Sequence, residues 1–228
     1  MATGLGTEIE EREIGIAINS KVIEGTLSIP QNSVGVVLFA HGSGSGRFSP
    51  RNRYVANVLQ NGGLATLLVD LLTREEERVD TQTAHLRFDI NMLATRLIEA
   101  TKWLASNPDT QRLKPGYFGA STGAGAALVA AAYWADAIHA VVSRGGRPDL
   151  ASRAVLRQVR APTLLIVGGN DTPVIEMNRL ALEHLNVEKR LEIISGATHL
   201  FEEPGKLERV AQLAHEWFYR HLHGGTSP

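Results

Sequence analysis

The chain contains no cysteine, which excludes disulfide bonds, thiolate zinc ligands and a cysteine nucleophile. It also lacks an excess of charge of either sign, because 23 Lys and Arg residues stand against 24 Asp and Glu residues. Bulk electrostatics therefore give no reason to expect a nucleic-acid partner. No apolar run approaches the roughly 20 residues of a membrane span, and no signal peptide is visible at the N-terminus. We expect a cytoplasmic protein that binds neither nucleic acid nor membrane.

What is present is enough for one folded domain. The 228 residues have a hydrophobic content of 43%, which can supply a sizeable core. We expect a single domain over residues 1–228, with the segments 1–7 and 224–228 frayed. The sequence does not decide between a monomer and a homodimer.

The hydrophobic pattern predicts an α/β fold. Alternating apolar and polar residues indicate an antiparallel hairpin over residues 8–30, with its turn at Asn19 and Ser20. From residue 34 onward, apolar runs alternate with segments of helical spacing, which predicts a mostly parallel sheet covered by helices on both faces. Strands are expected at 34–40, 64–70, 117–118, 137–142, 162–167 and 190–194, and helices at 54–59, 89–106, 123–132, 150–159, 175–185 and 206–221. The acidic segment 74–78 is interpreted as a solvated loop, and the stretch between 143 and 162 is too short for a cap domain.

The segment Gly119-Ala120-Ser121-Thr122-Gly123 has the form G-x-S-x-G, which is typical of a nucleophile on a sharp turn between a strand and a helix. Glycine two residues to either side lets the strand and the helix approach closely. The motif alone is a weak signal, because glycine and serine are common in this chain.

Two further loops add an acid and an imidazole. Asp171 follows the predicted strand 162–167, and His199 follows the strand 190–194. Functional groups of parallel sheets gather beyond the carboxyl ends of the strands, so we expect Ser121, Asp171 and His199 to meet there. A serine hydroxyl needs a base to become a nucleophile, His199 can be that base, and Asp171 can hold its imidazole. The simpler alternative for Asp171 is capping of the following helix.

With these motifs in place, the sequence resembles the α/β-hydrolases, and within them the dienelactone-hydrolase-like group. The resemblance rests on His41-Gly42, on the G-x-S-x-G segment, and on the segments 168–174 and 196–201 in that order. It implies an α/β-hydrolase fold without a cap, and hydrolysis of a small-molecule ester through an acyl-enzyme, with no cofactor and no metal. Dienelactone hydrolases proper use cysteine where this chain has Ser121, which favours ordinary esters over dienelactone.

The resemblance also implies the groups around the nucleophile. The oxyanion would be bound by the backbone N–H of Thr122 and by that of Ser43 in the loop after residue 40. His41 is expected to make a structural hydrogen bond. Apart from the resemblance, Gly42, Arg47 and Arg144 are candidates to border the substrate, and the simpler alternative for the arginines is that they are solvated. Thioesters, feruloyl or aryl esters and acyl transfer would use the same residues. A non-catalytic or an engineered protein of this fold stays open as an alternative.

Overall fold

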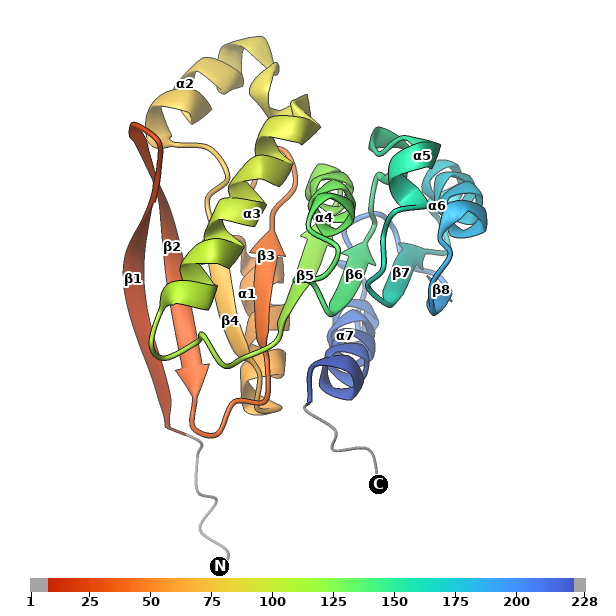
Figure 1. Ribbon diagram of the computed structural model, residues 1–228. Coiled ribbons are helices and arrows are strands. Elements are labelled where there is room, and N and C mark those ends of the chain that lie inside the picture. The colour runs from red at the N-terminus through yellow and green to blue at the C-terminus, as the bar shows by residue number, and fades with distance from the viewer. Residues whose placement is uncertain (1–7, 224–228) are drawn as a thin grey trace, which may run out of the picture.

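An eight-stranded sheet forms the centre of the computed structural model, which describes residues 8–223 (Figure 1). Its strands are β1 (Ile9–Ile18), β2 (Lys21–Pro30), β3 (Val36–Ala40), β4 (Ala65–Val69), β5 (Pro115–Ala120), β6 (Ala140–Arg144), β7 (Thr163–Gly168) and β8 (Lys189–Ile194). The order across the sheet is β1-β2-β4-β3-β5-β6-β7-β8. The two segments predicted to be frayed, 1–7 and 224–228, lie outside the described residues.

The sheet begins antiparallel and continues parallel. Strand β2 pairs antiparallel with both β1 and β4, whereas all pairs from β4 to β8 are parallel. The hairpin turn is made at Asn19, whose φ of 54° suits the left-handed region that asparagine tolerates. The predicted mostly parallel sheet with an N-terminal hairpin is confirmed.

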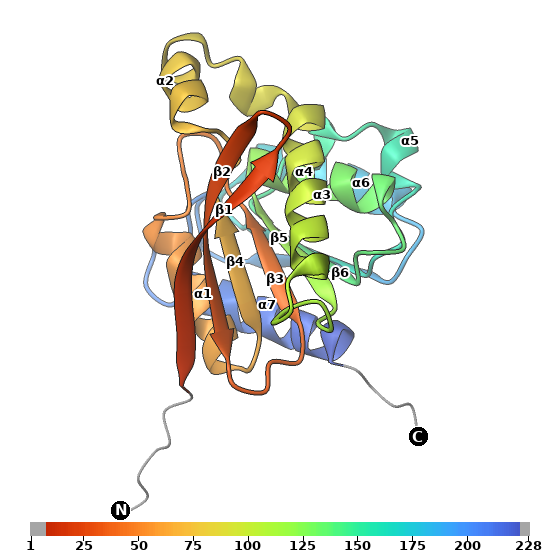
Figure 2. The same ribbon diagram turned by 60° about the vertical axis from the view of Figure 1, so that its left-hand side comes forward.

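Helices cover both faces of the sheet, as Figures 1 and 2 show. The helices are α1 (Pro50–Asn61), α2 (Arg74–Thr83), α3 (Ile90–Ser106), α4 (Thr122–Tyr133), α5 (Arg153–Leu156), α6 (Thr172–His184) and α7 (Lys206–Leu222), with 3-10 turns η1 (Leu86–Phe88) and η2 (Pro148–Leu150). Helices α1 and α7 pack on one face, and α3 and α4 on the other. Only η2 and α5 lie between β6 and β7, where a cap would be inserted.

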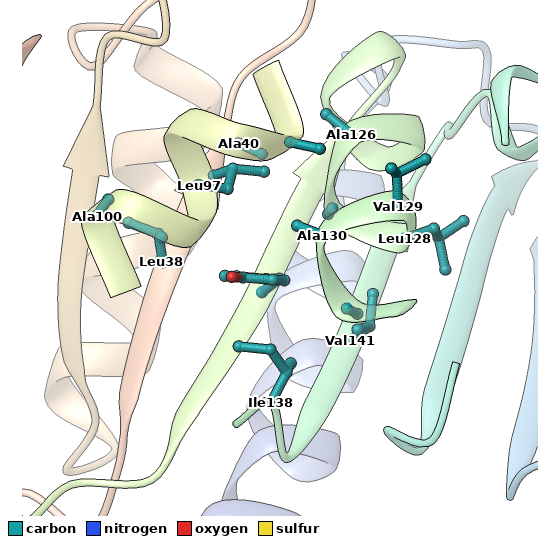
Figure 3. Close-up of a cluster of buried hydrophobic side chains, with 14 of the residues drawn as sticks. Leu38, Ala40, Leu97, Ala100, Ala126, Leu128, Val129, Ala130, Ile138 and Val141 are labelled. Carbon is teal, nitrogen blue, oxygen red and sulfur yellow. The ribbon is translucent and has the colours of Figure 1, made fainter. Parts of the chain in front are cut away.

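The core has two layers because neighbouring residues of a buried strand point to opposite faces. In β3, Leu38 and Ala40 join the cluster under α3 and α4, while Val37 and Phe39 join the cluster under α1 and α7. Figure 3 shows the first cluster, in which Leu97 of α3 lies close to strand β3. The nearly all-apolar composition of this strand follows from its burial on both faces.

The interpretation of residues 74–78 as a loop is wrong, because they begin helix α2. Thr73 and Glu76 form a reciprocal capping box: the Glu76 N–H donates to Thr73 Oγ1 at 3.3 Å, and the Thr73 N–H donates to the Glu76 carboxylate at 2.9 Å. The glutamates of the first turn also favour a helix N-terminus. Figure 1 shows α2 beyond the end of the sheet at which β3 and β5 finish.

Two other helices have different bounds from those expected. Helix α1 starts at Pro50, earlier than predicted, with Ser49 as its N-cap and proline in the first turn. The helix expected over 150–159 is only the single turn α5. None of the helices in the described part of the chain has the length and apolar character needed to cross a membrane.

Candidate active site

Ser121 occupies a strained turn between β5 and α4. Its φ of 50° and ψ of −122° are rarely adopted by residues with a side chain. The turn is held because the Ser121 N–H donates to the carbonyl of Arg144 at 3.2 Å, and its own carbonyl accepts from the N–H groups of Ala124 and Arg147 at 3.1 Å each. Strain of this kind concentrates at functional sites, so the backbone conformation supports Ser121 as a candidate functional residue.

Both glycines of the motif are required by close backbone approach. A Cβ atom on Gly119 would lie 2.4 Å from Cα of Ala124, and one on Gly123 would lie 2.3 Å from the carbonyl oxygen of Ala40. Side chains at either position would therefore force the strand, the helix and the loop after β3 apart. The sequence-based expectation that glycine is needed at both positions for close approach of strand and helix agrees with these distances.

Asp171 and His199 meet at the same edge of the sheet, after β7 and β8. Their Oδ2 and Nδ1 atoms are 2.6 Å apart. Asp171 stands at the N-cap position of α6, but its side chain makes no capping hydrogen bond. The Asp171 carboxylate therefore contacts His199 and does not cap helix α6. With Nδ1 donating to Asp171, the basic nitrogen left on His199 is Nε2.

The third residue lies nearby without a hydrogen bond. Within residues 8–223 the Ser121 hydroxyl has no hydrogen-bond partner, and in particular it makes no hydrogen bond with His199. The imidazole lies against Gly145, which directly follows β6 beside the nucleophile turn, and a Cβ atom there would be 3.4 Å from Cε1 of His199. Hydrogen bonds of catalytic groups are often completed only when substrate binds.

The loop after β3 packs directly onto the nucleophile. A Cβ atom on Gly42 would lie 3.0 Å from Cβ of Ser121. The N–H of Thr122 is the first of α4 and has no acceptor within the helix. The N–H of Ser43 donates to the hydroxyl of Thr122 at 3.1 Å, and the two hydroxyls are also 3.1 Å apart. Ser43 must share or release this bond to serve an oxyanion.

His41 fastens this loop to the end of β4. Its Nε2 accepts the N–H of Leu71 at 2.9 Å, so its proton lies on Nδ1, which faces the carbonyl oxygen of Gly42 at 3.0 Å. Burial lowers the pKa of His41, while the Gly42 carbonyl and the charges of Asp70 and Glu77 oppose that shift. The neutral ring is consistent with the structural hydrogen bond expected from the sequence.

Arg47 lies in an ion cluster with three carboxylates. Its guanidinium forms salt bridges with Asp70, with Glu24 at 2.8 Å and with Glu13 at 3.2 Å. Burial lowers the pKa of Arg47, but the hydrogen bonds with Asp70 and Glu24 outweigh that effect and raise it. The Arg47 side chain is only 7% exposed and its guanidinium is engaged by these three carboxylates, so a substrate contact of Arg47 stays a prediction.

Arg144 is buried at the end of β6 and, within residues 8–223, has no carboxylate partner. Its Nη2 donates to Oδ1 of Asn52 at 3.1 Å, and its Nε has no hydrogen-bond partner. Burial, followed by the charge of Arg51, lowers the pKa of Arg144 to about 10, so the group stays charged at neutral pH. The bond to Asn52 directs it toward α1. A substrate contact of Arg144 stays a prediction.

Sequence reasoning missed the contribution of α2. Glu77, Asp80 and Thr81 of this helix line a recess whose other side is formed by Ser43 and Thr122. The signal that could have found the helix is the capping-box pattern of Thr73 and Glu76. Among residues 8–223, no three His, Asp or Glu side chains gather in a way that could hold a metal ion.

Known proteins resemble this chain over nearly its whole length. The model of the dienelactone hydrolase family matches residues 23–222. A crystal structure of dienelactone hydrolase from Anabaena variabilis is 63% identical, with a TM-score of 0.92, and the match covers 94% of this chain and 99% of that one. Est1E from Butyrivibrio proteoclasticus shares the fold, with a TM-score of 0.77 at 15% identity and coverage of 92% and 98%.

A second kind of relative is longer. Two putative phosphoribosyl transferases of Mycobacterium tuberculosis are 55% identical over 216 residues, which are 95% of this chain but 48% of each of those proteins. The chain thus spans about half the length of the curated relatives it matches.

Proposed function

The chain belongs to the dienelactone hydrolase family, and from that membership and the geometry of the site we propose that it hydrolyses carboxylic esters through an acyl-enzyme on Ser121. Family membership supports a hydrolase. The observation that carries the finer proposal is the 2.6 Å contact between His199 and Asp171, at the sheet edge where Ser121 stands in its strained turn.

The proposed mechanism follows from the placement of these groups. Ser121 Oγ attacks the ester carbonyl while His199 Nε2 takes its proton, and Asp171 stabilises the imidazolium that forms. The oxyanion accepts hydrogen bonds from the backbone N–H groups of Thr122 and Ser43, each worth roughly 3 kcal/mol of barrier. His199 then protonates the leaving oxygen, and water activated by the same imidazole releases the acid.

We do not propose phosphoribosyl transfer for this chain. The match covers only half of the proteins that carry that name. The loop 42–46 is rich in glycine but lacks the Lys-Ser/Thr ending of a nucleotide-binding loop, and it packs on the nucleophile turn. A thioesterase, a feruloyl or aryl esterase or an acyltransferase would use the same groups and differ in the acyl acceptor or leaving group.

The test is covalent labelling. A fluorophosphonate should add once to the protein, as measured by intact mass, and p-nitrophenyl acetate should be turned over. Ser121→Ala should lose both the adduct and the turnover, whereas Ser106→Ala, at an exposed serine at the end of α3, should keep both. Absence of an adduct on folded protein would contradict the proposal and favour a non-catalytic protein of this fold.

A further inference from the structure

A recess of about 60 Å³ opens between the loop after β3 and helix α2. Ser43 and Thr122, which carry the proposed oxyanion donors, form one wall. Leu71, Leu72 and Leu93 supply apolar surface. At 10–15 Å³ for each water, the space corresponds to roughly four to six water molecules, so it suits a group of a few heavy atoms.

The position of the recess indicates which part of an ester it would hold. The leaving oxygen must receive a proton from His199, so the leaving group lies next to that imidazole. Ser121, His199 and Asp171 do not line the recess, whereas Ser43 and Thr122 do, together with Gly42. Gly42 is the lining residue that packs on Ser121, since a Cβ atom on it would lie 3.0 Å from Cβ of the serine. The recess therefore adjoins the residues that carry the proposed oxyanion donors and is not lined by the imidazole that protonates the leaving group, so its position suits the acyl chain.

The charged side chains that line the recess differ in whether they have an ion-pair partner. Arg87 lies at the recess but pairs with Asp80, its Nε donating to Oδ2 at 2.6 Å. Asp70 is paired with Arg47, which does not line the recess. Within residues 8–223 the carboxylate of Glu77 has no salt bridge and no side-chain hydrogen bond. One unpaired negative charge therefore remains at the rim, on an exposed residue of α2.

We propose that the recess is the acyl subsite and that Glu77 selects short acyl chains that carry a positive charge. This inference rests on the proposed ester hydrolysis at Ser121. An ammonium group two carbons from the carbonyl fits the size of the recess, keeps its methylene groups on the leucine surface and places its charge toward Glu77. A carboxylate in the same place would be repelled by Glu77 and would find no free cation among the described residues there, because Arg87 and Arg47 are already paired with Asp80 and Asp70.

The experiment compares three p-nitrophenyl esters whose acyl chains differ in charge. The 3-aminopropionyl and butyryl esters have equal numbers of heavy atoms and differ by one positive charge, and the succinyl ester carries a negative one. We expect kcat/KM to be highest for 3-aminopropionyl and lowest for succinyl, with spontaneous hydrolysis subtracted by using Ser121→Ala. In Glu77→Gln the ratio of the 3-aminopropionyl to the butyryl value should fall by about three- to fivefold, the size of a partly exposed ion pair.

Glu75→Gln is the matched control. Glu75 is exposed on the same helix, does not line the recess, and should keep the ratio of the parent protein. A higher kcat/KM for the succinyl ester, or a ratio of 3-aminopropionyl to butyryl kcat/KM that Glu77→Gln does not change, overturns the inference. The proposed ester hydrolysis at Ser121 is not affected by that result. Loss of all turnover together with failure of the fluorophosphonate to label Ser121 overturns the proposed function, and the inference falls with it.

Discussion

At the scale of single residues, the site depends on groups that the backbone holds in unusual positions. Ser121 is strained in its turn, Gly145 leaves room for the ring of His199, and Asp171 reaches that ring instead of capping its own helix. A carboxylate that is held against Nδ1 keeps the imidazole in the tautomer whose Nε2 can accept a proton. The carboxylate should therefore matter far more for turnover than for folding.

Asp171→Asn should lower kcat for p-nitrophenyl acetate by roughly 10³- to 10⁴-fold, because an amide cannot stabilise the imidazolium and favours the wrong tautomer. The measurement is steady-state kinetics with circular dichroism to verify folding. Asp149→Asn removes a more exposed carboxylate that pairs with Arg147, and should leave kcat within a factor of two. Retention of wild-type turnover by Asp171→Asn would refute the assigned role.

At the scale of elements, helix α2 is short and polar, so its position depends on an anchor and not on packing. Glu76 lies buried between the two guanidinium nitrogens of Arg96, each at 2.6 Å, and Nζ of Lys21 at 2.5 Å. Burial by itself would raise the pKa of Glu76, but the hydrogen bonds from Arg96, Lys21 and the Thr73 N–H lower it to about 2. The wall of the recess is thus attached to α3 through one carboxylate.

This anchor predicts acid sensitivity of stability. Because the pKa of Glu76 is lowered from 4.5 to about 2 in the folded state, its ionisation stabilises the fold above about pH 4.5, and that stabilisation is lost as the pH falls toward 2. Glu76→Gln should lower the free energy of unfolding by about 3 kcal/mol at pH 7, since Arg96 then stays buried without its counter-charge.

The check is urea unfolding at pH 7 and pH 3. The loss of stability between these two values should be smaller in Glu76→Gln than in the parent protein. Glu75→Gln, one residue away and exposed, should change the free energy of unfolding by less than about 0.5 kcal/mol at either pH. An unchanged stability of Glu76→Gln at pH 7 would mean that α2 is held by other contacts.

At the scale of the whole molecule, the residues of the candidate site come from segments as far apart as 42 and 199, and only the sheet brings them together. Each lies beyond the carboxyl end of a parallel strand, so their positions depend on the register of β3, β5, β7 and β8. Two core layers on opposite faces of one continuous sheet support that register. Over residues 8–223 the eight strands form one continuous sheet, without a break at which the site could be divided.

The continuous sheet predicts that residues 1–228 unfold in one cooperative transition. Near-ultraviolet and far-ultraviolet circular dichroism should give the same midpoint in urea, and fluorophosphonate labelling of Ser121 should disappear at that midpoint too. Earlier loss of labelling than of secondary structure would show that the site opens locally before the sheet melts.

Much of the fold could be predicted because its signals are local. Buried parallel strands require continuous apolar runs, and β3, β4 and β7 are such runs. The loops with Ser121, Asp171 and His199 each follow a predicted strand, and the topology of a parallel sheet brings these loops to one edge. Helix α2 was missed because it has few apolar residues, and its stability comes from a cap and from Arg96, which lies 20 residues away in the sequence.

The sequence by itself determined the class of fold, the mostly parallel sheet with its N-terminal hairpin, and the three residue types expected at one edge, since hydrophobic periodicity and glycine spacing are properties of the chain. Only the tertiary structure decided which partner each charged side chain contacts. It directs Asp171 to His199 and not to its own helix, places Arg47 among three carboxylates, and leaves Glu77 unpaired beside the recess. A charged side chain can serve several partners, and which one it meets depends on distances between segments that no local pattern records.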